Sequence, residues 1–215
     1  MSTLKLYDYF RSSACFRVRI ALELKNLNYE LIPIHLVHQG GEQFSDAYQS
    51  INPQSLVPSL QDGKKIITQS LAIIDYLNDL YPSPSLLPTD SYLKAKVNAF
   101  ALTIVADTHP LNNLRVLNYL TQELNISDEM KTKWYQHWMI KGLTALEKQL
   151  NTIQAPQHFC FGDQASLADI CLIPQLYNAR RFNIDLSHYP TLVRIDEYCQ
   201  LQSAFIKAWP KEPTT

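Results

Sequence analysis

A proline-rich break constrains this chain more than any other feature of its sequence. Residues 81–88 read Tyr-Pro-Ser-Pro-Ser-Leu-Leu-Pro. Three prolines in eight residues can neither continue a helix nor pair in the middle of a sheet, because proline lacks the backbone N–H that both structures use. The segment therefore predicts a linker. A chain of 215 residues is long enough to place a folded domain on each side of it, and we expect domains at 1–82 and 89–215 joined by residues 83–88.

Before the break, the apolar pattern switches between the period of a strand and that of a helix. Pro33 interrupts the second strand, which suits an edge of the sheet. The order βαβαββα predicts a small α/β domain. The predicted elements are strand Leu4–Tyr9, helix Arg17–Lys25, strand Tyr29–Leu36, a short helix Gln43–Ser50, a hairpin of Leu56–Leu60 and Lys65–Ile67, and helix Ser70–Leu80.

After the break, every periodic segment has helical spacing, which predicts an all-α second domain. The predicted helices are Tyr92–Asp107, Leu111–Leu124, Asp128–Leu150, Leu167–Ala179 and Thr191–Leu201.

Charge and cysteine content exclude several classes of function. The chain has 19 Lys and Arg against 20 Asp and Glu, for a net charge of -1, whereas a protein that binds nucleic acid through phosphates normally has a basic excess. Four scattered cysteines and the histidine spacing fit neither a disulfide framework nor a metal site. We see no secretory signal and no apolar run of the ~20 residues that a membrane helix needs. The expectation is a cytoplasmic protein with no membrane, nucleic-acid or metal partner.

The segment Arg11–Phe16, between the first strand and the first helix, is the first candidate site. A helix start offers unpaired N–H groups and a partial positive charge, which favour an anion such as a thiolate. Ser12 or Ser13 could equally be a simple N-cap. Cys15 has two interpretations as well, a reactive thiol with a lowered pKa or a small buried residue.

Two further loops carry candidate binding groups. Val57-Pro58 precedes a strand and is a candidate cis peptide, which would expose the Val57 backbone to a peptide-like ligand; proline at a strand start is also common without function. Gln69 and Ser70 open a helix and could hold a carboxylate, or could only cap that helix.

Several motifs in register resemble the zeta class of the cytosolic glutathione transferases. SSACFRVRIALELK is similar to the class motif SSC-x-x-R-V-R-I-A-L, and the likeness continues through NPQSLVPSL, ITQSLAIIDYL, THPLNNLRVLNYL, SLADICLIPQLYNARRF and HYPTL. It covers nearly the whole chain. The resemblance implies a thioredoxin-like N-terminal domain that binds glutathione as cofactor, an all-helical C-terminal domain that binds the substrate, and a homodimer.

The resemblance also implies roles for single residues. Ser12 would activate the glutathione thiolate, with Ser13 beside it and Cys15 as a further catalytic candidate. The class cysteine is displaced by one position, since Ala14 occupies the third place of the motif. Arg11 and Arg181 would face the carboxylates of the substrate. The glutathione contacts would be Gln43, Val57, Gln69, Ser70, His109 and Asn113.

The implied activity is a glutathione-dependent cis–trans isomerisation of maleylacetoacetate to fumarylacetoacetate, in tyrosine and phenylalanine degradation. It would proceed by thiolate addition, bond rotation and elimination. Isomerisation of maleylpyruvate in gentisate degradation is an alternative, as is a general glutathione transferase or haloacid dehalogenase. A non-catalytic binding module is disfavoured, because such proteins commonly lose the activating hydroxyl and Ser12 is present.

Overall fold

A computed structural model describes residues 3–152 and 157–212 of the chain. The chain divides into two compact units. Met1–Leu86 and Gln202–Thr215 form the first, and Leu87–Leu201 forms the second. The predicted combination of an α/β part and a helical part is confirmed.

The first unit contains a mixed four-stranded sheet in the order β2-β1-β3-β4. β1 pairs in parallel with β2 and antiparallel with β3, and β3 pairs antiparallel with β4. Pro33 lies in edge strand β2, as its missing N–H requires. The elements of this unit are β1 (Leu4–Asp8), α1 (Ser13–Leu24), β2 (Tyr29–Pro33), α2 (Asp46–Gln49), β3 (Ser59–Asp62), β4 (Lys65–Thr68), α3 (Ser70–Leu80) and α9 (Ser203–Ala208).

The register of the sheet brings three chain segments to one edge. Tyr7, near the end of β1, pairs with Ser59, the first residue of β3, and Ser59 pairs with Thr68, the last residue of β4. The loop after β1, the loop before β3 and the turn after β4 must therefore emerge side by side. These are the segments that contain Ser12, Val57 and Gln69.

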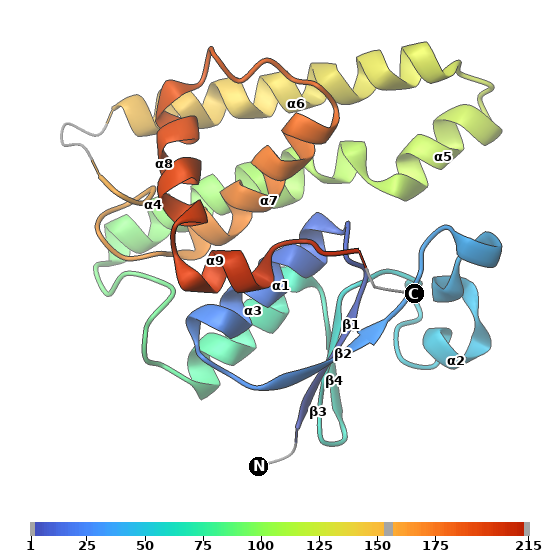
Figure 1. Cartoon of the computed structure of the whole chain (residues 1–215), viewed down its shortest axis with the longest axis horizontal. Coiled ribbons are helices and arrows are strands. Elements are labelled where there is room, and N and C mark those ends of the chain that lie inside the picture. Colours follow the sequence, from blue (N-terminus) through green and yellow to red (C-terminus); the bar gives the residue numbers. More distant parts are fainter. Residues whose placement is uncertain (1–2, 153–156, 213–215) are drawn as a thin grey trace. The chain divides into compact units, whose positions relative to one another are not determined.

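Helix α1 is buried on nearly every side, from Ser13 to Leu22. It packs against α3 and α9, and Figure 1 shows α9, in red, running beside α1 although almost the whole chain separates them in sequence. A helix enclosed in this way cannot show a clear polar face, which is why its first turn had no amphipathic signal.

The unit boundaries differ from the expected domains 1–82 and 89–215 at both ends, and each difference has a physical reason. Lys25 Nζ donates to the carbonyl oxygens of Tyr81 and Pro84, both at 2.5 Å, and so fastens the proline-rich segment to α1. Residues 202–215 return to the first unit, where Arg19 Nε donates to the Ala208 carbonyl at 3.0 Å.

The described part of the second unit is helical in its regular structure, apart from an isolated β-bridge between Phe159 and Gly162. A π-helical segment, Thr103–Thr108, continues α4, and a short 3-10 turn, Pro110–Asn112, precedes α5. Two buried carboxylates cap helices here: Asp169 completes the capping box of α7, and Glu147 accepts from the first amides of α8. The helices are α4 (Ser91–Leu102), α5 (Leu114–Gln122), α6 (Asp128–Asn151), α7 (Leu167–Arg181) and α8 (Pro190–Gln200).

Three expected helix boundaries are corrected. α1 begins at Ser13 and not at Arg17, because the Ser12 hydroxyl oxygen accepts from the Cys15 amide and caps the helix. The helix expected at Tyr92–Asp107 changes to π geometry at Thr103. α5 begins at Leu114 because Asn113 caps it. Helix α9 was not expected at all.

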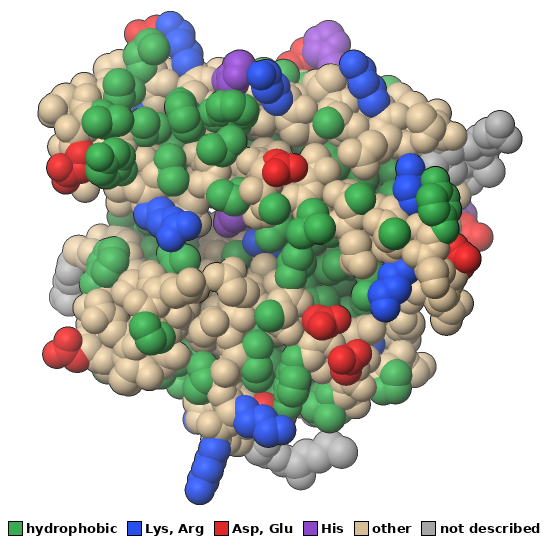
Figure 2. Space-filling view, turned by 180° about the vertical axis from the view of Figure 1, so that it is seen from behind, with side chains coloured by type: hydrophobic (Ala, Val, Ile, Leu, Met, Phe, Trp, Pro, Cys, Tyr) green, Lys and Arg blue, Asp and Glu red, His purple; other side chains and the backbone are tan. Residues whose placement is uncertain are grey.

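Side chains of both charge signs are scattered over the face of the protein in Figure 2. Among the described residues, no helix combines the length and the apolar character needed to cross a membrane.

Gly142 provides a test of packing in the second unit. A Cβ at this position of α6 would lie 2.3 Å from Thr108 Oγ1. Gly142→Ala ordinarily favours a helix by about 1 kcal/mol, but here we expect a net loss of about 1–3 kcal/mol from overpacking, measured by urea unfolding. Adding Thr108→Ala removes the two atoms nearest to the new Cβ and should recover most of the lost stability. A double variant as unstable as Gly142→Ala alone would contradict this explanation.

Candidate functional site

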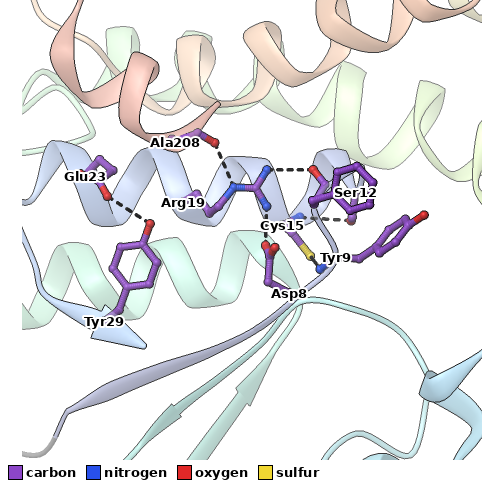
Figure 3. A network of polar contacts seen from close by, with 9 residues as sticks. Asp8, Tyr9, Ser12, Cys15, Arg19, Glu23, Tyr29 and Ala208 are labelled. Carbon is purple, nitrogen blue, oxygen red and sulfur yellow. Dashed lines mark hydrogen bonds and ion pairs between the residues drawn. The ribbon is translucent and has the colours of Figure 1, made fainter. Parts of the chain in front are cut away.

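Ser12 lies at the first of the three converging loops. Its N–H donates to the Tyr9 carbonyl at 2.8 Å, which closes a turn after β1. Its Oγ accepts from the Cys15 amide at 3.3 Å (Figure 3). The side chain is half-buried, lies beside the Cys15 thiol, and is partly open to solvent at the start of α1. The Ser12 hydroxyl can therefore donate to an anion held at the start of α1, where the helix dipole also favours negative charge.

Ser13 and Cys15 lie deeper than Ser12. Ser13 is the first residue of α1 and is 4% exposed, and Cys15 is fully buried. The Cys15 sulfur accepts from the Tyr9 amide at 3.4 Å. Burial, and next the Asp8 carboxylate, raise the pKa of the Cys15 thiol, so that burial outweighs the helix terminus. The buried-residue interpretation of Cys15 is the one that this geometry supports.

The second loop presents a backbone amide at the same edge of the sheet. The Val57–Pro58 peptide is cis, as the sequence suggested. The Leu56 carbonyl accepts from the hydroxyl of Tyr48 and from Asn52 Nδ2, both at 2.7 Å. No hydrogen-bond partner for the Val57 amide is found among the described residues. These two hydrogen bonds fix the loop, while the Val57 amide is available to a ligand.

Tyr48 and Asn52 are each 2% exposed and were missed by the sequence analysis. They act on the loop through side-chain hydrogen bonds to its backbone, and although Asn52 opens the motif NPQSLVPSL, the motif does not reveal this contact. The neighbouring Asn-Pro dipeptide at 52–53 signals a turn but not this contact.

The third loop is the turn from β4 into α3. Gln69 has a left-handed backbone, with φ 69°, and its Nε2 donates to Gln54 Oε1 at 2.8 Å. Ser70 is buried and its Oγ accepts from Arg17 Nε at 3.1 Å. No side chain of the described residues caps α3, so its first amides can bind a carboxylate.

Gln43 is buried, with 6% of its surface exposed. Its Nε2 donates to the Leu36 carbonyl at 3.3 Å, whereas its Oε1 has no hydrogen-bond partner within the described part of the chain. A Cβ on Gly41, whose φ is 104°, would lie 2.6 Å from this side chain, so glycine is required there. A buried acceptor without a partner is costly, which suits an oxygen that pairs with a ligand donor.

Arg11 is exposed and its Nη2 lies 3.3 Å from Glu212 Oε1. Both side chains of this ion pair are open to solvent, and such pairs contribute little to stability. The Arg11 guanidinium can therefore exchange this partner for a ligand carboxylate at little cost.

The predicted site residues of the second unit are His109, Asn113 and Arg181. His109 ends the π-helical segment, and Asn113 Oδ1 accepts from the Arg115 amide at 3.1 Å as the N-cap of α5. The segment between them is fixed by α6, because Asn112 Nδ2 donates to the Tyr135 carbonyl at 3.0 Å and Trp134 Nε1 to the Leu111 carbonyl at 2.8 Å.

The adjacent arginines at the end of α7 have different environments. Arg180 Nη2 lies 2.6 Å from Oδ2 of Asp196, whose side chain is fully buried. Arg181 is exposed, and its Nη1 donates to Asn178 Oδ1 at 3.1 Å. Arg180 is thus committed to a buried carboxylate, while Arg181 can meet a ligand, which is consistent with the choice of Arg181 from the sequence.

The structure brings Ser12, Val57, Gln69 and Ser70 to one edge of the sheet in the first unit. In the part of the chain that the structure describes, no group of three or more His, Cys, Asp or Glu side chains could hold a metal ion. The arrangement offers a hydroxyl donor, a backbone amide and a helix N-terminus, which together suit an anionic, peptide-like ligand.

Residues 6–85 match the family described as glutathione S-transferase, N-terminal domain. Over 211 residues the chain is 47% identical to a Vibrio cholerae protein named "Probable maleylacetoacetate isomerase", with 98% of this chain and 97% of that protein covered.

Two solved structures are also similar to this chain over nearly its whole length. A holo structure of maleyl pyruvate isomerase, described as a bacterial glutathione S-transferase in the zeta class, is 39% identical with a TM-score of 0.93, over 96% of each chain. The maleylacetoacetate isomerase of Anaeromyxobacter dehalogenans 2CP-1, with glutathione bound in its active site, is 42% identical with a TM-score of 0.85, over 97% of this chain and 95% of that one.

The environment of Cys15 makes a testable prediction. Because its pKa is raised, its thiol stays protonated at neutral pH and should react slowly with an aromatic disulfide reagent until the protein unfolds. Cys15→Ala should keep turnover within about threefold of wild type, since the thiol does no chemistry. Rapid labelling of native Cys15, identified by peptide mass, or a loss of turnover of about tenfold or more in Cys15→Ala, would contradict this assignment.

Proposed function

This chain belongs to the zeta class of the glutathione transferase family, and on that premise we propose that it is a glutathione-dependent cis–trans isomerase of maleyl dicarboxylates. The observation that carries the proposal is the convergence of the Ser12 hydroxyl, the Val57 amide and the start of α3 at one edge of the sheet. Those groups are the ones that a thiol-containing tripeptide requires.

The residues of the first unit fit glutathione as cofactor. The unpaired Val57 amide would bind the peptide backbone, and the uncapped start of α3, with Gln69 and Ser70, would hold a carboxylate. The buried, unpaired Oε1 of Gln43 is an acceptor for an N–H donor. When bound, glutathione supplies a thiolate that adds reversibly to the cis double bond of the substrate and so permits rotation about it.

Ser12 would hold the negative charge of the cofactor. A free thiol has a pKa of about 8.5, so that only a minority is ionised at neutral pH. Hydrogen-bond donation from the Ser12 hydroxyl stabilises the anion, and the N-terminus of α1 adds a favourable field. Both effects lower the thiol pKa and raise the thiolate fraction.

Arg11 and Arg181 would orient the two carboxylates of the substrate and stabilise the negative charge that develops next to the double bond. Both are exposed. Arg11 has an exchangeable surface partner, Glu212. His109 and Asn113 are proposed as further cofactor contacts from the second unit, and Ser13 as a support for Ser12.

Within this class we propose maleylacetoacetate as the substrate, and a place in tyrosine and phenylalanine degradation. Maleylpyruvate is the second candidate, because relatives named for either substrate have similar identity to this chain, 42% for a maleylacetoacetate isomerase and 39% for a maleylpyruvate isomerase. We also propose that the protein is a cytoplasmic homodimer. Analytical ultracentrifugation tests the dimeric state. Exposed apolar side chains on α4, among them Tyr92 at 74% exposure, are compatible with a subunit interface.

Initial rates with maleylacetone and with maleylpyruvate, each with and without glutathione, test the proposed function. We expect saturable dependence on glutathione for both, and a higher kcat/KM for maleylacetone, the analogue of maleylacetoacetate, than for maleylpyruvate. Isomerisation at the same rate without glutathione would contradict the proposal. Conjugation of electrophiles without any isomerisation would favour a general transferase.

Ser12→Ala should lower kcat/KM about tenfold or more, because the anion loses its hydroxyl donor. Ser13→Ala is the matched control, since it removes a neighbouring hydroxyl that is buried, and it should have a smaller effect. Equal losses in the two variants would show that Ser12 is not the main activator.

The two arginines at the end of α7 form a second matched pair. Arg181→Gln should raise KM for the dicarboxylate about tenfold while leaving the melting temperature unchanged. Arg180→Gln should instead lower the melting temperature and leave KM unchanged, because it leaves the buried Asp196 carboxylate without its cation. The reverse pattern in thermal melts and steady-state kinetics would contradict the proposed role of Arg181.

A further inference from the structure

Arg19 is a buried cation on α1 whose guanidinium has three acceptors. The whole residue is 4% exposed. Its Nη1 forms an ion pair with the Asp8 carboxylate, its Nη2 donates to the Phe10 carbonyl at 3.1 Å, and its Nε donates to the Ala208 carbonyl at 3.0 Å. Figure 3 shows the guanidinium in the middle of this network.

The position of Arg19 along α1 explains why its guanidinium can contact these three acceptors. It lies seven residues after Ser12, which is two helical turns, so the two residues share a face of the helix. Long side chains on a helix point back toward its N-terminus. The Arg19 guanidinium therefore lies at the start of α1, next to the loop that connects β1 to this helix.

The acceptors of Arg19 bracket the turn that holds Ser12. Asp8 is the last residue of β1, and the turn that follows is closed by the hydrogen bond from the Ser12 amide to the Tyr9 carbonyl. Phe10 lies inside this turn. A carbonyl inside such a turn ordinarily points to solvent, whereas here a buried charged donor holds it.

The third acceptor ties the C-terminal segment to the same point. Ala208 is the last residue of α9, and Trp209 packs edge-on against Phe16 of α1 at 5.5 Å between ring centroids. The Phe10 turn is thus held between the end of a strand and the end of a helix that lies 189 residues from Arg19 in sequence.

We infer that Arg19 is a positioning residue for Ser12, which fixes the turn Tyr9–Ser12 by joining the Asp8 carboxylate, the Phe10 carbonyl and the end of α9. Arg19 acts through the turn and not on the ligand. The role deepens the proposed function and rests on it, since Ser12 is the group that it would aim at the cofactor thiol.

A buried arginine with three acceptors also contributes to folding, because its loss leaves the Asp8 carboxylate buried without its cation. A fall in stability alone would therefore not distinguish positioning from structure. Lys25 provides a matched control: it is 6% exposed, caps the far end of the same helix, and also has three acceptors, in Asn78, Tyr81 and Pro84.

Arg19→Gln, Arg19→Lys and Lys25→Gln should be compared for hydrogen exchange in the turn and for the ionisation of bound glutathione, followed by ultraviolet absorbance of the thiolate. We expect faster exchange of the Ser12 amide in both Arg19 variants. We also expect the pKa of the bound thiol to rise by about one unit, which lowers the thiolate-to-thiol ratio about tenfold at a given pH. Arg19→Lys, which keeps a charged donor, should fall between Arg19→Gln and wild type.

Lys25→Gln should lose stability but keep the exchange rate and the thiolate fraction of wild type. Adding Arg19→Gln to Ser12→Ala should lower the thiolate fraction no further, because both changes remove the same contact. If the Arg19 variants match Lys25→Gln in both readouts, Arg19 is only structural and the inference is overturned.

The exchange measurement needs no ligand and so separates the two proposals. If wild-type protein neither binds glutathione nor isomerises maleyl compounds, the proposed function fails, while Ser12 exchange still decides whether Arg19 fixes the turn. Unchanged Ser12 exchange in Arg19→Lys overturns the inference even if Arg19→Gln does not fold.

Discussion

The backbone pairing between β1, β3 and β4 is the constraint on which the site depends. Tyr7, Ser59 and Thr68 lie in one row across the three strands, so the segments next to them must emerge at the same edge. Shifting the register by one residue would move every side chain of a strand to the opposite face and misalign these loops. Ser12, Val57 and Gln69 come from distant parts of the sequence, and hydrogen bonds that involve no site residue bring them together.

Burial of α1 has a second consequence, because cations buried on this helix and at its C-cap must find acceptors inside the protein. Arg17 donates to Ser70 at the start of α3, Arg19 binds Asp8, and Lys25 binds the carbonyls of the proline-rich segment. These contacts lie at the end of a strand, at the ends of neighbouring helices and in the proline-rich segment. The polar residues of α1 thereby fix the geometry of the loops around it, and the apolar ones supply the core.

Local patterns in the sequence were sufficient for the succession of strands and helices along the chain, the proline break and most helices, since these follow from periodicity over a few residues. The start of α1 was missed because Ala14, Cys15 and Phe16 are all buried and show no polar face. Helix α9 has six residues, too few for a periodic signal. The roles of Tyr48 and Arg19 depend on contacts with distant or irregular backbone, such as the bond to Ala208, which no local pattern encodes. The motif resemblance identified the loops, but the groups that hold those loops required the structure.

The thiol pKa of glutathione bound to the wild-type protein tests the central claim most directly. If Ser12 and the start of α1 hold an anion at this edge of the sheet, thiolate absorbance measured against pH should give a value clearly below the ~8.5 of a free thiol. A bound thiol that ionises at the same pH as the free one would contradict the account.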